Sequence, residues 1–257
     1  MPDTIHADVV LKLRAAGCVF AEDEADLLLA AATTPAELDS LVERRVAGLP
    51  LEHLLGWAEF HGLRITVGPG VFVPRHRTEF LVDVAVSLAP VDPVVLDLCC
   101  GSGALGAAFA AAVRPAELHA ADVEPAAVEC ARVNVPGEVY LGDLYDALPG
   151  SLRGRVDVLL ANVPYVPSDA VATMPPEARL HEPLSALDGG ADGLDLARQV
   201  AAGAPDWLAR GGVLLIESSE RQAPVATEIF AAAGLSPRVH SSEELGATVV
   251  SGTASNV

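Results

Sequence analysis

The segment Val94–Gly106 constrains the fold more than any other part of this chain of 257 residues. It reads VVLDLCCGSGALG, which is an apolar run, a glycine-rich turn and the start of an alanine-rich stretch. This order predicts a buried strand, a tight loop and a helix whose N-terminus holds a nucleotide-like ligand. The segment therefore favours an α/β fold with a ligand pocket beside the loop.

Two polar groups follow at the ends of later apolar runs. Asp122 ends the run Glu117–Asp122, and its carboxylate can accept hydrogen bonds from two ribose hydroxyls. The tetrapeptide Asn162-Val163-Pro164-Tyr165 ends a third run, VDVLLA. Ligands of open α/β sheets bind at the carboxyl ends of the strands. We therefore expect a cofactor pocket and a polar reaction edge on one side of one sheet.

The glycines alone do not identify the cofactor. Gly101–Gly106 fits the pattern G-x-G-x-x-G, which leaves a nicotinamide oxidoreductase open as an alternative. Two features disfavour it, because Cys99 and Cys100 separate the strand from the first glycine and Asp97 places an acid at the strand's end. The pattern Asp-x-x-x-Gly-x-Gly resembles the first motif of class I S-adenosylmethionine methyltransferases.

The tetrapeptide Asn-x-Pro-Tyr suits methylation of a planar nitrogen. A carboxamide nitrogen is a poor nucleophile, so a catalyst must hold it in line with the methyl group, at about 3–3.5 Å. The side-chain carbonyl of Asn162 and the backbone carbonyl of Val163 can each accept one N–H of the amide. Tyr165 can pack against the amide plane, and no metal is required. The expected catalytic residues are Asn162, Val163, Pro164 and Tyr165.

Composition narrows the classes of partner. The formal net charge is −19, and such a surface repels the phosphates of nucleic acids, which disfavours direct nucleic-acid binding. No apolar stretch reaches the roughly 18 residues of a membrane helix. The N-terminal sequence lacks the pattern of a signal peptide, and the four cysteines lack metal-ligand spacing. We expect a cytoplasmic protein without a metal site.

The order of elements predicts a small helical domain followed by an α/β domain. In residues 1–50, Thr34, Pro35 and Glu37 form a helix start with a capping box. Residues 51–77 read as an interdomain segment with a β-hairpin strand at 63–67, and residues 78–257 as the catalytic domain. Alternating strands and helices predict a doubly wound, mostly parallel sheet. Strands are expected at 94–98, 117–122, 138–141, 156–161 and 212–217, with helices at 104–112, 125–134 and 193–209, an antiparallel pair within 237–252 and a loose tail from 251.

Several further segments, in the correct order, resemble the protein-(glutamine-N5) methyltransferases that modify peptide-chain release factors. They are LPLEHLLG at 49–56, EF and GL at 59–63, VPR and TE at 73–79, EP, ALDGG and DGL at 182–194, and GG with LLIE at 211–217. This resemblance covers about residues 45–220. It implies a class I methyltransferase fold, S-adenosylmethionine as the cofactor, and a protein substrate with an exposed glutamine, such as a release factor.

The resemblance also implies roles for single residues. In that family the acid at Asp97 lies near the methionine amino group, the loop glycines let the backbone approach the cofactor, and Asp143 lies where adenine is contacted. The residues expected to bind the cofactor are Asp97, Cys99, Cys100, Gly101, Ser102, Gly103, Asp122, Asp143, Leu144 and Asn162.

Two residues depart from the family pattern. Val163 stands where the family has proline, and Cys99 stands where it has glycine. The helical domain is also short for the family. Because Val163 precedes a proline, it is held in an extended conformation, so we expect a competent site with altered side-chain contacts. The departures keep two alternatives open: an N-methyltransferase of a small molecule or nucleic acid base, and a non-catalytic cofactor-binding paralogue.

Overall fold

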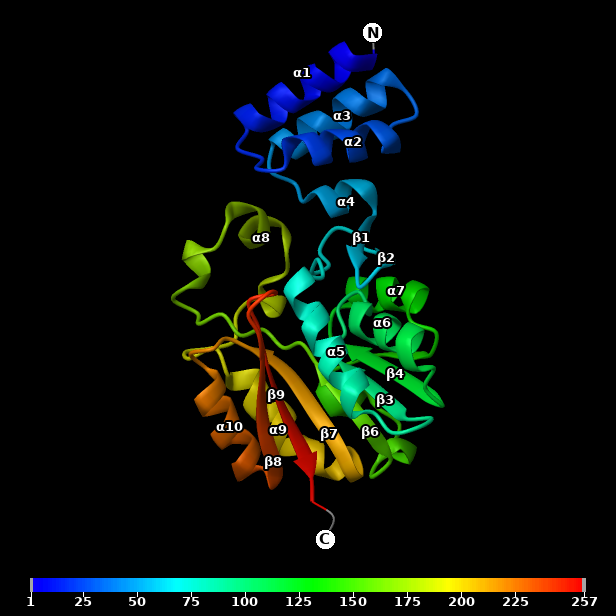
Figure 1. The fold of residues 1–257 in the computed structure, drawn as a ribbon, viewed down its shortest axis with the longest axis vertical. Helices are drawn as coiled ribbons and strands as arrows, with labels where there is room; N and C mark the ends of the chain where they lie inside the picture. Colours follow the sequence, from blue (N-terminus) through cyan, green and yellow to red (C-terminus); the bar gives the residue numbers. More distant parts are fainter. Residues whose placement is uncertain (1, 256–257) are drawn as a thin grey trace.

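The protein is described by a computed structural model that covers residues 2–255. Three helices lie together at one end of the molecule, above a larger α/β body (Figure 1). They are α1 (Pro2–Ala15), α2 (Ala21–Ala31) and α3 (Pro35–Val46), followed by α4 (Leu51–Leu55) and the antiparallel hairpin of β1 (Trp57–Phe60) and β2 (Leu63–Thr66).

The N-terminal helices have a hydrophobic cluster of their own. Leu13, Leu28 and Val42 are buried in it, and Leu54 of α4 packs against it. The N-cap predicted for α3 is confirmed, since Thr34 Oγ1 accepts a hydrogen bond from the Glu37 amide at 3.2 Å. The Glu37 carboxylate accepts from the amide and the hydroxyl of Thr33 and not from the Thr34 amide, so the reciprocal half of the predicted capping box is not formed. The proposed boundaries at residues 50 and 77 remain a prediction.

A seven-stranded sheet in the order β5-β4-β3-β6-β7-β9-β8 forms the centre of the body. Strands β3 to β7 are parallel, whereas β9 is antiparallel to both of its neighbours. The strand order reverses between β3 and β6, as predicted for a doubly wound sheet. The strands are β3 (Val94–Leu98), β4 (Glu117–Asp122), β5 (Glu138–Leu141), β6 (Val156–Ala161), β7 (Leu208–Ser218), β8 (Leu235–Ser242) and β9 (Ala247–Ala254).

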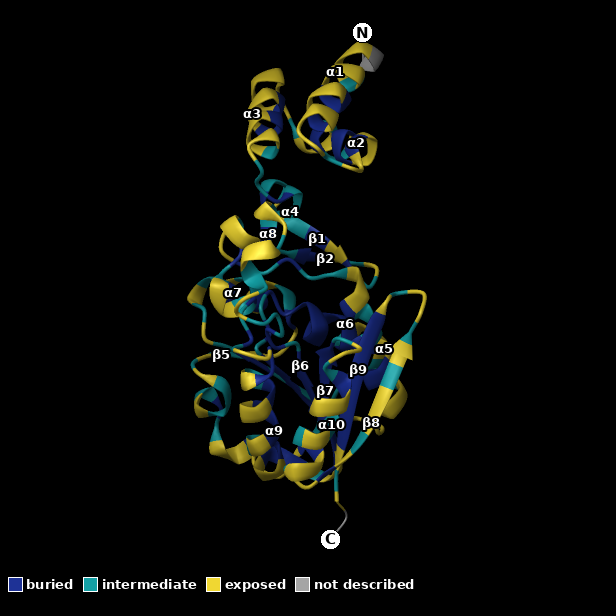
Figure 2. Ribbon diagram, turned by 90° about the vertical axis from the view of Figure 1, so that its left-hand side faces the viewer, coloured by how far each residue is buried: buried dark blue, intermediate teal, exposed yellow. Residues whose placement is uncertain are grey.

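Helices cover both faces of this sheet (Figures 1 and 2). Side chains alternate along each strand, so Leu160 packs in the cluster under α5 and α6 while its neighbour Leu159 packs in the cluster under α9 and α10. The helices are α5 (Glu79–Leu88), α6 (Ala104–Val113), α7 (Pro125–Asn134), α8 (Pro176–His181), α9 (Asp195–Trp207) and α10 (Ala223–Ala232), with short 3-10 helices at 76–78, 144–147, 150–152, 171–173 and 184–186. No helix in residues 2–255 is long and apolar enough to cross a membrane.

The C-terminal tail differs from the prediction. The residues from Ser251 to Ala254 were expected to be loose, but they extend β9, which pairs with β7 on one side and β8 on the other. Ser251 is buried there, because β9 lies between two other strands of the sheet. Asn256 and Val257 lie outside the described residues.

Candidate active site

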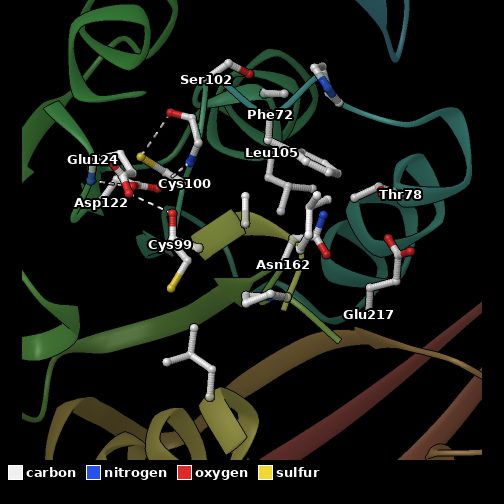
Figure 3. A pocket seen from close by; sticks show the side chains of 18 of the residues that line it. Phe72, Thr78, Cys99, Cys100, Ser102, Leu105, Asp122, Glu124, Asn162 and Glu217 are labelled. Atoms are coloured by element: carbon white, nitrogen blue, oxygen red, sulfur yellow. Dashed lines mark hydrogen bonds between the residues drawn. The ribbon is translucent and has the colours of Figure 1, made fainter. Parts of the chain in front are cut away.

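A cavity of about 300 Å³ lies at the carboxyl ends of β3, β4 and β6, where the strand order reverses (Figure 3). Most residues that the sequence singled out line this cavity. They are Cys99, Cys100, Gly101, Ser102, Asp122, Asp143, Leu144, Asn162, Pro164 and Tyr165. Asp97, Gly103 and Val163 are not among its lining residues.

The loop between β3 and α6 is held in a left-handed backbone conformation. Gly101 and Gly103 have φ of +54° and +78°, and Cys99 has φ of +57°. A Cβ on Gly103 would lie 2.4 Å from Val135 Cγ2, so this position has no room for a side chain. Cys99 therefore occupies a conformation that favours glycine, at the position where the resembled family has glycine. Burial raises the pKa of the Cys99 thiol, which disfavours its reaction as a thiolate.

Asp122 holds the loop and faces the cavity. Its Oδ2 accepts a hydrogen bond from the Gly101 amide at 2.8 Å, and its Oδ1 accepts one from the Glu124 amide at 2.9 Å. Burial raises the pKa of this carboxyl, while the backbone bonds oppose that change. Each oxygen keeps a free lone pair for a further donor. The pair of oxygens therefore fits the two hydroxyls of a ribose.

Asp97 lies beneath the loop and not in the cavity wall. The residue is fully buried, and its Oδ2 accepts a hydrogen bond from the Gly106 amide at 2.8 Å. Its Oδ1 has no partner among the described residues. Burial raises the pKa of Asp97 to about 8. The structure thus places this acid where it fixes the first turn of α6, and direct lining of the cavity, as expected of a cofactor contact, is not observed.

Asn162 presents its side chain to the cavity. The residue follows β6, lines the cavity and, within residues 2–255, makes no side-chain hydrogen bond. A side-chain amide that the protein leaves unpaired beside a cavity is available to a ligand. Pro164 and Tyr165 extend the same wall.

The side chain of Val163 points elsewhere. Val163 is 2% exposed and packs in the cluster that joins β6 to α9 and α10. The departure from the family's proline therefore falls on a side chain that packs in the core and does not line the cavity. This result corrects the expectation of altered contacts within the site.

Arg77, Tyr165 and Glu217 form a hydrogen-bonded group that the sequence did not single out. The Tyr165 hydroxyl donates to Glu217 Oε1 at 2.8 Å and accepts from Arg77 Nη2 at 2.5 Å, while Arg77 Nε donates to Glu217 Oε1 at 3.0 Å. Burial and the nearby carboxylate raise the pKa of the Tyr165 hydroxyl, which keeps it protonated. The sequence analysis included Glu217 only as the last residue of the LLIE segment, and no sequence pattern predicted a role for Arg77.

The loop after Tyr165 is fixed against the same wall. Gln222 Nε2 donates to the Tyr165 carbonyl at 2.9 Å, and a Cβ on Gly189 would lie 2.6 Å from the Pro164 carbonyl oxygen. Farther along the loop, Glu182 accepts two hydrogen bonds from Arg75, at 2.6 and 2.7 Å. The backbone that carries the tetrapeptide is therefore held from several sides.

The cavity fits a nucleoside cofactor by its size, by the Asp122 carboxylate and by its apolar wall of residues such as Leu144 and Leu196. Within residues 2–255, no three or more His, Cys, Asp or Glu side chains are grouped to hold a metal ion.

Comparisons with known proteins agree with this geometry. The family model of the methyltransferase small domain matches residues 63–228. A release factor glutamine methyltransferase of Gloeobacter violaceus is 40% identical over 205 residues, which are 76% of this chain and 71% of that protein. A 4-amino-L-phenylalanine/4-methylamino-L-phenylalanine methyltransferase of Streptomyces pristinaespiralis is 35% identical over 242 residues, 90% of this chain and 82% of that protein. A solved methyltransferase from Pyrococcus furiosus, 17% identical, matches the fold with a TM-score of 0.57 over 76% of this chain and 90% of its own.

Proposed function

The chain belongs to the family of release factor glutamine methyltransferases, and from this premise we propose that it methylates the side-chain amide nitrogen of a glutamine in a peptide-chain release factor. S-adenosylmethionine is the methyl donor. The observation that carries the proposal is the unpaired Asn162 side chain, which faces the cavity that Asp122 and the glycine loop also line.

The residues of the cavity divide into two functional groups. Asp122 binds the ribose, the loop 99–103 approaches the cofactor with its backbone, and Asp143 and Leu144 lie where the adenine is expected. Asn162 faces the acceptor instead, and its side-chain oxygen accepts one amide N–H. A second acceptor is the backbone carbonyl of Val163. These two bonds orient the nitrogen toward the methyl group, and S-adenosylmethionine supplies a sulfonium leaving group.

The division of the chain supports a protein acceptor. We propose a helical domain at 1–50, an interdomain segment at 51–77 and a catalytic domain at 78–257. The separate hydrophobic cluster of α1, α2 and α3 supports the first boundary. A helical domain beside the catalytic cavity adds surface for a folded substrate, and the net charge of −19 disfavours nucleic acid as that substrate.

The test is transfer of a labelled methyl group to the purified release factor of the host. The matched control is the same release factor with the glutamine of its Gly-Gly-Gln loop replaced by asparagine, which shortens the side chain but keeps the amide. Label on the first and none on the second supports the proposal. Equal labelling of both places the acceptor elsewhere.

A second candidate is methylation of an amine on a small aromatic amino acid. The observation that favours it is the match to the Streptomyces pristinaespiralis enzyme, which extends over 90% of this chain. Transfer to 4-amino-L-phenylalanine, and none to the release factor, selects this candidate.

A further inference from the structure

We propose that Glu217 is a catalytic residue of this transfer, in which its Oε2 contacts the acceptor nitrogen and takes up the proton that the nitrogen loses. The proposal rests on the proposed function for the identity of the acceptor. It concerns the chemistry of the site and holds for a glutamine amide or an aromatic amine alike.

The two oxygens of the Glu217 carboxylate have different surroundings. Oε1 accepts hydrogen bonds from Arg77 Nε at 3.0 Å and from the Tyr165 hydroxyl at 2.8 Å. Oε2 is buried and has no partner among the described residues. The residue as a whole is 3% exposed. Burying a carboxylate oxygen without a hydrogen-bond donor costs free energy. A ligand that donates an N–H to Oε2 would remove this cost.

A second buried carboxylate in the same region also holds an arginine. Glu182 accepts from Arg75 Nη2 with both oxygens, and its Oε1 also faces the Val73 amide at 3.3 Å. Neither oxygen of Glu182 is left without a partner. Fixing an arginine therefore does not require an unpaired oxygen, and Glu217 differs from Glu182 in this respect.

Glu217 lines the same cavity as Asn162. Its carboxylate is directed to the part of the cavity that holds Asn162 and Thr78 (Figure 3). The residue also borders a second cleft of about 420 Å³, which shares Arg77, Tyr165 and Glu217 with the first. Glu217 thus separates the cofactor cavity from a neighbouring cleft.

Hydroxyl side chains line the second cleft, and each can act as both donor and acceptor. The hydroxyl side chains of the cleft are those of Ser218, Ser219, Ser241, Ser242 and Thr248.

The acceptor nitrogen forms a bond to the methyl carbon as the bond from that carbon to sulfur breaks, and the electron pair of the broken bond stays on sulfur as a neutral thioether. The nitrogen now carries a positive charge and one proton too many. Glu217 Oε2 takes this proton and releases it to solvent when the products leave. A base placed in this way contributes about 10²–10⁴-fold to the rate.

The first test needs no acceptor. Sinefungin resembles S-adenosylmethionine but carries an ammonium group in the region of the transferred methyl. If Glu217 Oε2 faces this point, Glu217→Gln weakens sinefungin at least tenfold and S-adenosylhomocysteine less than threefold, as measured by calorimetry. Glu182→Gln, the matched control, changes the two affinities by the same factor. Equal weakening of both ligands by Glu217→Gln overturns the proposal.

The second test is the rate of methyl transfer to the acceptor. Glu217→Gln keeps an oxygen for Arg77 and Tyr165 but cannot take up a proton, so kcat falls at least a hundredfold while the KM for the acceptor changes less than threefold. Glu217→Asp, which keeps a carboxylate, recovers part of the lost kcat. A wild-type kcat in Glu217→Gln contradicts the proposal. If the wild-type protein methylates no release factor, the proposed function fails, while the sinefungin comparison still decides the role of Glu217.

Discussion

At the scale of single residues, backbone conformation explains what the sequence departures do. Val163 precedes a proline and turns its side chain into the core, so this side chain does not line the cavity. Cys99 adopts φ of +57° without being glycine, and it lies in the cavity wall. Neither departure removes a group on which the proposed chemistry depends.

Asn162→Ala separates binding from chemistry. Because the Asn162 side chain orients the acceptor and makes no bond within residues 2–255, its loss leaves the affinity for S-adenosylmethionine within a few-fold. The rate of methyl transfer falls on the order of a hundredfold or more, since an acceptor used in the transition state is gone. Calorimetry and initial rates measure the two effects. Unchanged activity in the variant would move the acceptor site elsewhere.

Asp122→Ala tests the ribose assignment. The lost hydrogen bonds weaken S-adenosylmethionine binding by about 1–3 kcal/mol. Asp146→Asn serves as the control, because this exposed acid lies just after the cavity-lining residues Asp143 and Leu144 and does not itself line the cavity. A similar loss of affinity in both variants would point to general charge effects instead.

Asp97→Asn tests the raised pKa of the buried Asp97 carboxyl through the pH dependence of stability. Its pKa is raised to about 8 in the folded protein, so the folded state binds this proton more tightly than the unfolded state does. Stability from this group is therefore full below the ordinary aspartate pKa of about 4 and is lost as pH rises toward 8. Urea unfolding should show the wild type losing stability relative to Asp97→Asn across this window, by up to about 1.4 kcal/mol per pH unit. Parallel pH curves would refute the raised pKa.

At the scale of elements, most of the parallel strands could be predicted, whereas helices α4, α5, α8 and α10 could not. Strands β3, β4, β5 and β6 have the predicted bounds because each is a short apolar run between turn residues. Helix α5 was missed because its run FLVDVAVSL is rich in valine and buried on several sides, which blurs the helical period. Helix α10 was missed as well, although a proline lies in its first turn, where proline is typical of a helix start.

The site also contains residues that could be predicted from the sequence and residues that could not. Residues that follow strands, such as Asp122 and Asn162, could be predicted because the edge of a parallel sheet brings them together. The pair of Arg77 and Glu217 joins residues 140 positions apart, and no local pattern signals such a contact.

Arg45 joins two of the N-terminal helices to each other and to α8 through two ion pairs. Arg45 of α3 bonds to Glu24 of α2 at 2.6 Å and to Glu177 of α8 at 3.1 Å, and its side chain is 10% exposed. Arg45→Ala leaves the Glu24 carboxylate buried without its partner, which should cost about 3–5 kcal/mol in urea unfolding. Arg44→Ala, at an exposed position on the same helix, should stay within about 0.5 kcal/mol. Equal effects of the two would show that the buried pair contributes nothing.

At the scale of the whole molecule, the three N-terminal helices and the loop that carries α8 lie on the same side of the sheet as the carboxyl ends of its parallel strands (Figure 1). The contact of Arg45 with Glu177 connects them. A folded protein that brings a side chain to Asn162 would meet these elements. Free glutamine would lack those contacts and should be a poor substrate, since remote contacts supply the energy of positioning.

The central claim is that the methyl group goes to a glutamine side-chain nitrogen. The most direct measurement incubates the protein with a lysate of its host and labelled S-adenosylmethionine, and then maps the modified residue by mass spectrometry. We expect one labelled protein of the release factor class, with the methyl group on a glutamine amide. Label confined to small-molecule amines or to nucleic acid would contradict the account.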